Sequence, residues 1–294
     1  MIKTTNTNLQ QANQAMLREL EIGRKIQASF LPKTLLQPSG WEIAACFEAA
    51  REVAGDFYDV FPLSGVKRVG LVVGDVCDKG VGAALFMALF RSLIRAFAEQ
   101  HYSLSWMDVL SNDAPAPARN GSVERRRALL STGTTALKNA IDHTNNYIVR
   151  NHGDTSMFAT VFCGVLDPAT GALVYINAGH VPPAVINASG VKARLEPTGP
   201  ALGLLPDMDF SIEQVDLEVG DTLLVFTDGV TDARGPNEEF FTEERLLSLV
   251  SRPVSSAAAL LELIQSSLHE HMASADQYDD ITMLAARRNP VFSI

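Results

Sequence analysis

Four acidic motifs lie far apart in this chain of 294 residues, and each borders an apolar run that is typical of a β-strand. They are Gly55-Asp56-Phe57-Tyr58-Asp59, Gly74-Asp75-Val76-Cys77-Asp78-Lys79-Gly80, Thr227-Asp228-Gly229 and Asp279-Asp280-Ile281-Thr282. Strands are depleted in Asp, and carboxylates normally lie on the solvated surface. Aspartates placed repeatedly at strand ends therefore predict one shared site. Because clustered carboxylates repel one another, such a site requires cations between them.

The chemistry that suits these motifs is that of a divalent-metal centre with oxygen ligands. Two hard cations about 3.5–4 Å apart can clamp an in-line displacement and lower the pKa of a shared water molecule. Hydrolysis of a phosphate ester fits, since a metal-filled pocket attracts a dianion that bare carboxylates would repel. The sequence has no nucleophile elbow, no Walker A loop and no zinc-ligand spacing. We interpret Cys77 as a small space-filling residue, because its neighbours are hard oxygen ligands.

Composition is that of an ordinary globular protein, with 47% hydrophobic and 20% charged residues. The net charge of -10 argues against a general nucleic-acid binder. We see no apolar run of the length that a membrane span requires, and the polar N-terminus has no signal-peptide character. The three cysteines are too few and too scattered for a disulfide framework. These features predict a cytoplasmic protein that binds neither nucleic acid nor membrane.

Many strands with a few long helices, and no regular βαβ rhythm, indicate an α+β domain with mostly antiparallel sheet. Periodicity predicts helices over residues 8–31, 80–100, 134–150, 242–250 and 255–272. It predicts strands within 41–62 and over 69–73, 158–166, 173–177, 184–186, 210–217, 222–226 and 281–286. The proline-rich and arginine-rich stretch that follows residue 103 interrupts this pattern. We therefore expect a surface loop, inserted at about residues 103–127.

Five segments in this order resemble the metal-dependent 2C-class serine/threonine phosphatases, and more narrowly the bacterial sporulation stage II protein E branch. The segments are residues 50–59, 73–85, 177–183, 226–233 and 279–282, and the resemblance covers roughly residues 21–288. It implies a sandwich of two mostly antiparallel β-sheets flanked by helices, with two Mn²⁺ or Mg²⁺ ions in the cleft between the sheets. It also implies a phosphoserine or phosphothreonine substrate on a small regulatory protein, often an anti-sigma-factor antagonist.

The resemblance also assigns roles to individual residues. Its metal ligands and catalytic carboxylates correspond to Asp56, Asp75, Asp228 and Asp279, with the backbone carbonyl of Val76 as a further metal ligand. Asp75 would bridge the two ions. We favour Asp279 over Asp280, although adjacent strand residues point to opposite faces and only one of them can face the metals. Arg51 either grips the substrate phosphate through its guanidinium or is an ordinary surface arginine.

Other polar residues near the motifs have two interpretations each. Asp59, Asp78 and Asp232 either touch the site or are solvated. His180 is either a catalytic acid or part of a structural turn, and the two prolines that follow it favour the turn.

The domain prediction is an N-terminal helical linker or switch segment at residues 1–35 and a phosphatase domain at residues 36–290. The N-terminal helix is either a packed cap or a connector that forms a homodimer. The leading functional hypothesis is a metal-dependent protein serine/threonine phosphatase that activates water with two metal ions. The alternative is a catalytically weak, partner-binding switch module of the same fold. A third hypothesis is hydrolysis of a small phosphorylated metabolite.

Overall fold

The computed structural model describes residues 2–63, 67–111, 121–252 and 254–290, with the backbone alone for residues 2–9, 11–12 and 101–132. The helices are α1 Ile2–Phe30, α2 Val81–Ser111, α3 Gly121–His152, α4 Asp228–Thr231, α5 Glu243–Val250 and α6 Ala257–Met272, with a short 3₁₀ turn at Gly153–Thr155. The strands are β1 Trp41–Glu48, β2 Phe57–Leu63, β3 Arg68–Val76, β4 Ala159–Leu166, β5 Ala172–Ala178, β6 Ala184–Asn187, β7 Gly190–Arg194, β8 Glu213–Asp216, β9 Thr222–Phe226 and β10 Ile281–Arg288.

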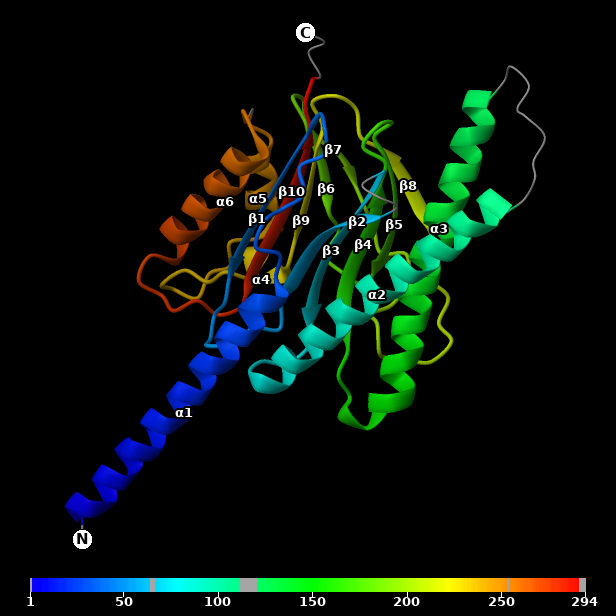
Figure 1. Cartoon of the computed structure of the whole chain (residues 1–294). Coiled ribbons are helices and arrows are strands. Elements are labelled where there is room, and N and C mark those ends of the chain that lie inside the picture. Colours follow the sequence, from blue (N-terminus) through cyan, green and yellow to red (C-terminus); the bar gives the residue numbers. More distant parts are fainter. Residues whose placement is uncertain (1, 64–66, 112–120, 253, 291–294) are drawn as a thin grey trace.

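The strands form two five-stranded sheets in the orders β1-β10-β9-β6-β7 and β2-β3-β4-β5-β8, and every pairing between neighbouring strands is antiparallel. The sheets pack face to face, with α2 and α3 outside the β2-β3-β4 sheet and α5 and α6 outside the β1-β10-β9 sheet (Figure 1). This arrangement confirms the predicted α+β sandwich flanked by helices.

Three apolar layers hold the sandwich together. Leu71 and Leu284 belong to the layer between the two sheets. Phe90 lies in the layer beneath α2 and α3, and Leu260 lies in the layer beneath α6. Because the sheets are covered on both faces, β3 is buried along its whole length except at Asp75. A strand covered on both faces reads as a continuous apolar run, which is why β3 was recognisable in the sequence.

Helix α2 differs from the expectation that no apolar run is long enough to span a membrane. Its stretch Val81–Gln100 has a mean hydropathy of 1.6 over 20 residues, which meets that criterion by length and composition. Met87, Phe90 and Ile94 follow one another at helical spacing and are completely buried in the layer beneath the helix. The apolar composition of α2 therefore serves its packing onto the sheet.

The stretch expected as an inserted loop is largely helical. Residues 103–111 continue α2 and residues 121–127 open α3, while residues 112–120 lie outside the described part of the chain. The Arg and Leu residues of 125–130 have good helix propensity, which favours a helix there. Strand β7 and the single turn α4 were not predicted, because β7 is short and mostly exposed and α4 is four residues long.

Close packing between β2 and β3 generates a stability prediction. Gly70 lies opposite Phe61, and a Cβ at Gly70 would lie 2.6 Å from an atom of that buried ring. Gly70→Ala should lower the free energy of unfolding by about 1–3 kcal/mol through overpacking. The matched control is Gly82→Ala in α2, where the new Cβ meets nothing within 4 Å. Urea denaturation should find the control unchanged or stabilised by up to about 1 kcal/mol. Equal stability of the two variants would contradict this packing.

Candidate metal centre

The topology carries the four predicted carboxylates to one end of the sandwich. Asp56 immediately precedes β2, and Asp75 is the penultimate residue of β3, the antiparallel neighbour of β2. In the other sheet, Asp228 follows the end of β9, and Asp279 comes two residues before its antiparallel neighbour β10. Since one strand of each pair begins where the other ends, all four residues lie at corresponding ends of the two sheets.

A hydrogen bond joins the sheets at this end. The Thr227 hydroxyl donates to Oδ2 of Asp56 at 2.7 Å, and the Thr282 amide donates to the same hydroxyl at 3.1 Å. Thr227 belongs to the β9–α4 junction, whereas Asp56 begins β2 in the opposite sheet. Asp56, Thr227 and Thr282 are each at most 2% exposed. The first carboxylate is therefore held from across the sandwich by a buried threonine pair.

Burial and mutual repulsion dominate the electrostatics of the site. Burial, followed by the negative charges of Asp75 and Asp280, holds the pKa of Asp56 well above its usual range. Burial and the charges of Asp228 and Asp279 raise the pKa of Asp75 to about 7, although a hydrogen bond with Asp56 opposes the rise. Burial and the charge of Asp279 also raise the pKa of Asp228. The carboxylates are thus close enough to disfavour one another's ionisation.

The two adjacent aspartates before β10 have different partners. Asp280 accepts the Ala50 amide on Oδ1 at 2.7 Å and the Gly55 amide on Oδ2 at 2.8 Å, so both of its oxygens hold the turn that precedes Asp56. Asp279 accepts the Asp280 amide on Oδ1 and faces the Lys79 ammonium at 2.8 Å with Oδ2. These different partners favour Asp279 as the metal ligand and give Asp280 a structural role.

The Val76 carbonyl approaches the turn that carries Asp56. A Cβ built at Gly55 would lie 2.8 Å from the Val76 oxygen, so a side chain at this position would crowd the carbonyl. Glycine therefore permits the backbone before Asp56 to lie against the backbone after Asp75.

The donor set fits hard divalent cations better than soft ones. The candidate ligands are carboxylate and carbonyl oxygens, which Mg²⁺ and Mn²⁺ prefer. Among the described residues, no three Asp, Glu, His or Cys side chains already enclose a single point as a metal site would. The fit rests on the oxygen chemistry and on the uncompensated repulsion among Asp56, Asp75 and Asp228, which bound cations would relieve.

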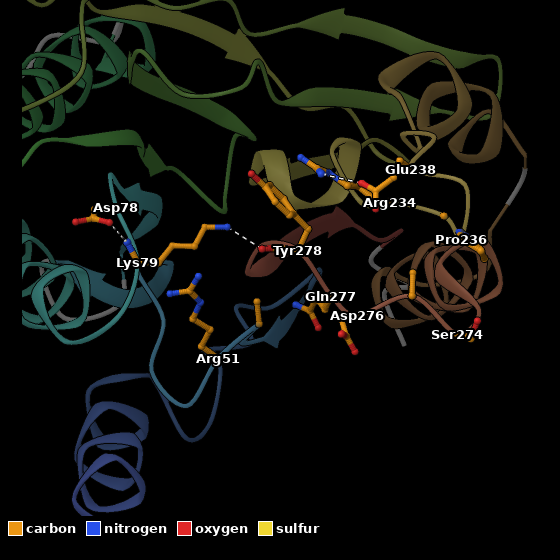
Figure 2. Close-up of a pocket in the computed structure, with 13 residues that line it drawn as sticks. Arg51, Asp78, Lys79, Arg234, Pro236, Glu238, Ser274, Asp276, Gln277 and Tyr278 are labelled. Atoms are coloured by element: carbon orange, nitrogen blue, oxygen red, sulfur yellow. Dashed lines mark hydrogen bonds and ion pairs between the residues drawn. The ribbon is translucent and has the colours of Figure 1, made fainter. Parts of the chain in front are cut away.

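A cavity of about 830 Å³ lies on the side of Lys79, the residue that pairs with Asp279, but none of the four candidate carboxylates lines it (Figure 2). Arg51, Lys79, Arg234 and Tyr278 are among its lining residues. Figure 2 shows the Arg51 side chain extending from its turn toward the Lys79 side of the cavity. The Arg51 guanidinium, for which the sequence analysis gave both phosphate binding and an ordinary surface position, is therefore exposed on the wall of this cavity.

The three other aspartates near the motifs lie outside the group of candidate ligands or at its edge. Asp59 is buried against α2, where it pairs with Arg91 at 2.9 Å and Arg95 at 3.4 Å. Asp78 lies exposed on the cavity wall, and exposed Asp232 contributes to the raised pKa of Asp228.

His180 has a structural environment. It is 1% exposed, its Nδ1 lies 3.0 Å from the Thr160 hydroxyl, and its amide donates to the Asn177 side chain. Burial lowers the pKa of His180 to about 4, so the imidazole is neutral at ordinary pH. These contacts favour the structural turn over the catalytic acid, with the Thr160 hydroxyl as the partner of Nδ1 and the Asn177 side chain as the partner of the backbone amide.

Some residues that shape the site had no role in the sequence analysis. Lys79 was visible inside the second motif, and Thr227 and Tyr278 each directly precede a predicted ligand. Their contacts cross between strands that are far apart in the sequence, so no local pattern marked them.

Comparisons with known proteins agree with this architecture. Residues 65–289 match the family described as stage II sporulation protein E. Protein IcfG of Synechocystis is 44% identical over 273 residues, which are 92% of this chain and 42% of that protein. Phosphoserine phosphatase RsbU of Bacillus subtilis is 27% identical, over 94% of this chain and 71% of that one. The chain thus spans less than half the length of the first of these relatives.

A solved structure extends the comparison to the fold. The PP2C domain of SiaA from Pseudomonas aeruginosa superimposes with a TM-score of 0.66 at 21% identity, covering 94% of this chain and 98% of that domain. The two-sheet sandwich with its flanking helices is therefore the PP2C fold.

Repulsion within the site generates a prediction for the metal-free protein. Because the folded pKa of Asp75 is raised to about 7, this carboxylate loses its folding contribution as pH rises from about 4 through 7. In chelator at pH 8, Asp75→Asn should raise the free energy of unfolding by on the order of 1–3 kcal/mol. At pH 5, where Asp75 is protonated in the folded protein but mostly ionised in the unfolded chain, the difference should be smaller without vanishing. Urea denaturation at both pH values measures it, and a wild type as stable as the variant at pH 8 would contradict the repulsion.

Proposed function

We propose that this chain, which belongs to the stage II sporulation protein E family, is a metal-dependent protein serine/threonine phosphatase. Its substrate would be a phosphoserine or phosphothreonine on a bacterial regulatory protein of the anti-sigma-factor antagonist type. The observation that carries the proposal is the meeting of Asp56, Asp75, Asp228 and Asp279 at one end of the sandwich, where burial and neighbouring carboxylates raise the pKa values of Asp56, Asp75 and Asp228. A buried anionic cluster of this kind is tolerable when cations fill it.

Each residue of the proposed centre has a distinct part. Asp56, Asp75, Asp228 and Asp279 would hold two Mn²⁺ or Mg²⁺ ions, with the Val76 carbonyl as a further oxygen ligand. When bound, such ions supply Lewis-acid stabilisation of phosphoryl oxygens and a lowered pKa for water. Thr227 keeps Asp56 in place through its 2.7 Å hydrogen bond, and Asp280 fixes the turn before Asp56 through two amides.

The neighbouring cavity would receive the phosphorylated segment of the substrate. Its volume of about 830 Å³ is sufficient for several side chains, and Arg51 is one of its lining residues. A guanidinium can donate two parallel hydrogen bonds to a phosphate, so Arg51 would orient the ester before hydrolysis. An open cavity suits a protein substrate better than a small metabolite, which enzymes usually enclose.

The alternative function is a catalytically weak switch module that binds a phosphorylated or unphosphorylated partner. The retained carboxylate cluster argues against it, because repulsion among buried charges destabilises the fold and a module without turnover gains nothing from it. A cytoplasmic location, with no nucleic-acid or membrane partner, is part of the leading proposal.

The N-terminal helix would form a homodimer and transmit a signal to the site. Met16, Leu17, Ile22 and Ile26 of α1 are each more than half exposed, and a cavity of about 520 Å³ separates α1 from the start of α2. Helix α1 projects away from the sandwich (Figure 1). A second copy would cover these apolar side chains, which isolated domains rarely expose in groups.

A direct contact links α1 to the centre. The Gln27 side chain donates to the Ala54 carbonyl at 2.6 Å and accepts the Ala54 amide at 3.0 Å. Ala54 lies two residues before Asp56, and Gln27 is 7% exposed. Movement of the helix would therefore displace the backbone that carries the first carboxylate.

Catalysis by the centre can be tested with phosphate release from a phosphorylated anti-sigma-factor antagonist and from a small aryl phosphate. We expect hydrolysis that depends on Mn²⁺ or Mg²⁺ and stops in chelator. Asp75→Asn and Asp228→Asn should each reduce the rate by orders of magnitude while the circular dichroism spectrum stays that of a folded protein. Asp59→Asn, outside the site, serves as the control. Full activity in chelator or in both variants defeats the proposal, and saturable partner binding without phosphate release favours the switch module.

Signal transmission through α1 can be tested by deletion and by a point change. Removing the residues before Gln27 should convert a dimer to a monomer in light scattering and change the rate of phosphate release. Gln27→Ala keeps the apolar face and removes the contact with Ala54, so it should change the rate and leave the mass unaltered. Unchanged mass and kinetics after the deletion would reject the role of the helix.

A further inference from the structure

Lys79 reaches across the edge of the candidate metal centre. Its ammonium lies 2.8 Å from Oδ2 of Asp279 and donates to the Tyr278 carbonyl at 2.7 Å. The two residues of the ion pair are separated by 200 positions in the chain and are about 27% and 30% exposed. The contact therefore joins the turn that follows the candidate ligands Asp75 and Val76 to the segment before β10, which carries Asp279.

The backbone of the β3–α2 turn fixes the direction of Lys79. Asp78 has φ 70° and Gly80 has φ 90°, so the residues on both sides of Lys79 are in the left-handed region. The Asp78 carboxylate accepts the Lys79 amide at 2.8 Å, which stabilises this conformation locally. A non-glycine residue at positive φ is uncommon and costs free energy, so the turn is held by its surroundings.

An aromatic ring fixes the other end of the side chain. The Lys79 ammonium lies 4.3 Å from the centre of the Tyr278 ring, and the Arg234 guanidinium lies 3.6 Å from the same centre. Figure 2 shows Tyr278 between these two cationic side chains. Arg234 is itself paired with Glu238 at 2.9 Å. Lys79 is therefore restrained by a carboxylate, a carbonyl and a ring face, and each of these favours a cation.

The position of the ammonium conflicts with full metal occupancy. Asp279 uses Oδ1 for the Asp280 amide and Oδ2 for Lys79, so a metal ion that binds Asp279 must share or displace the ammonium. Burial and the charge of Asp279 raise the pKa of Asp228, and the charge of Lys79 is one of the smaller influences that oppose this rise. A fixed positive charge at this place offsets the repulsion among the carboxylates and repels an incoming divalent ion.

We propose that Lys79 is a positioning residue of the carboxylate centre, a tethered cation that holds Asp279 in place and competes with a divalent ion for its Oδ2 oxygen. This inference rests on the proposed function, because it takes Asp279 as a metal ligand. Lys79 then sets the concentration of metal at which the centre fills. The structural alternative is a simple latch between two segments, which predicts a loss of stability without tighter metal binding when Lys79 is replaced.

The test is titration of the folded full chain with Mn²⁺ alone. Calorimetry measures the heat of binding, and electron paramagnetic resonance measures the concentration of free ion. Lys79→Met keeps the length of the side chain and its contact with the Tyr278 ring but removes the charge. It should tighten binding of the weaker Mn²⁺ ion by about tenfold, which corresponds to about 1.4 kcal/mol. Lys79→Arg retains the charge and should leave the affinity within about twofold of wild type. Unchanged or weaker binding by Lys79→Met would overturn the proposal.

A matched control removes an equivalent ion pair elsewhere. Lys192 lies 2.7 Å from Asp221, next to the opposite end of β9 from the site, so Lys192→Met should not alter Mn²⁺ affinity. If Lys192→Met and Lys79→Met tighten Mn²⁺ binding equally, the loss of one positive charge from the protein explains the effect, and the inference fails.

A double-mutant cycle tests whether Lys79 acts through Asp279. In an Asp279→Asn background the tightening caused by Lys79→Met should shrink markedly, since the contested oxygen is gone. An undiminished effect would contradict competition at Asp279.

Steady-state kinetics supplies a further check: if Lys79→Met raises KM for the phosphorylated substrate without changing Mn²⁺ affinity, Lys79 binds substrate and the inference fails. If the wild-type protein binds no Mn²⁺, both this inference and the proposed function fail. If it binds Mn²⁺ and releases phosphate but Lys79→Met does not change Mn²⁺ affinity, only the inference about Lys79 fails.

Discussion

Repulsion among buried carboxylates at one end of the sandwich is the constraint on which the surrounding structure depends. Asp56 and Asp75 belong to one sheet, and Asp228 and Asp279 belong to the other, so the pairing of the sheets itself brings like charges together. Hydroxyls, backbone amides and an ammonium are gathered around them, each of which favours a carboxylate. These neighbours reduce the repulsion without removing it, because burial and like charge still raise the pKa of Asp75 to about 7.

The same constraint explains why two adjacent aspartates do different work. Asp280 accepts two backbone amides of the turn before Asp56, whereas Asp279 accepts one backbone amide on Oδ1 and the Lys79 ammonium on Oδ2. An amide partner is part of the fold and cannot leave. An ammonium on a long side chain can move aside, so Asp279 remains available to a stronger cation.

Sequence patterns were sufficient for an α+β domain of mostly antiparallel sheet and for one shared site of the acidic motifs, whereas the two-sheet sandwich followed from the family resemblance. Buried strands such as β3 are continuous apolar runs, and an aspartate at the end of such a run is easily recognised. The patterns failed where structure depends on distant contacts or weak local signals. Prolines and arginines near residues 112–127 resembled a loop although helix α3 begins at residue 121, and β7 is too exposed to show alternation. The role of Lys79 was invisible, because its partners Tyr278 and Asp279 are about 200 residues away.

The hydrogen bonds that the Ala50 and Gly55 amides donate to Asp280 close long loops, over 230 and 225 residues. During synthesis on the ribosome, the turn that presents Asp56 must therefore wait for residue 280 before it has its acceptor. Strand β1 waits similarly for its neighbour β10. Contacts of such high sequence separation are slow to form, so the centre is among the last parts to be completed. A nascent polypeptide of which only Asp56, Asp75 and Asp228 have left the ribosome would carry three of the four carboxylates. It would still lack the Asp280 side chain that holds the turn before Asp56.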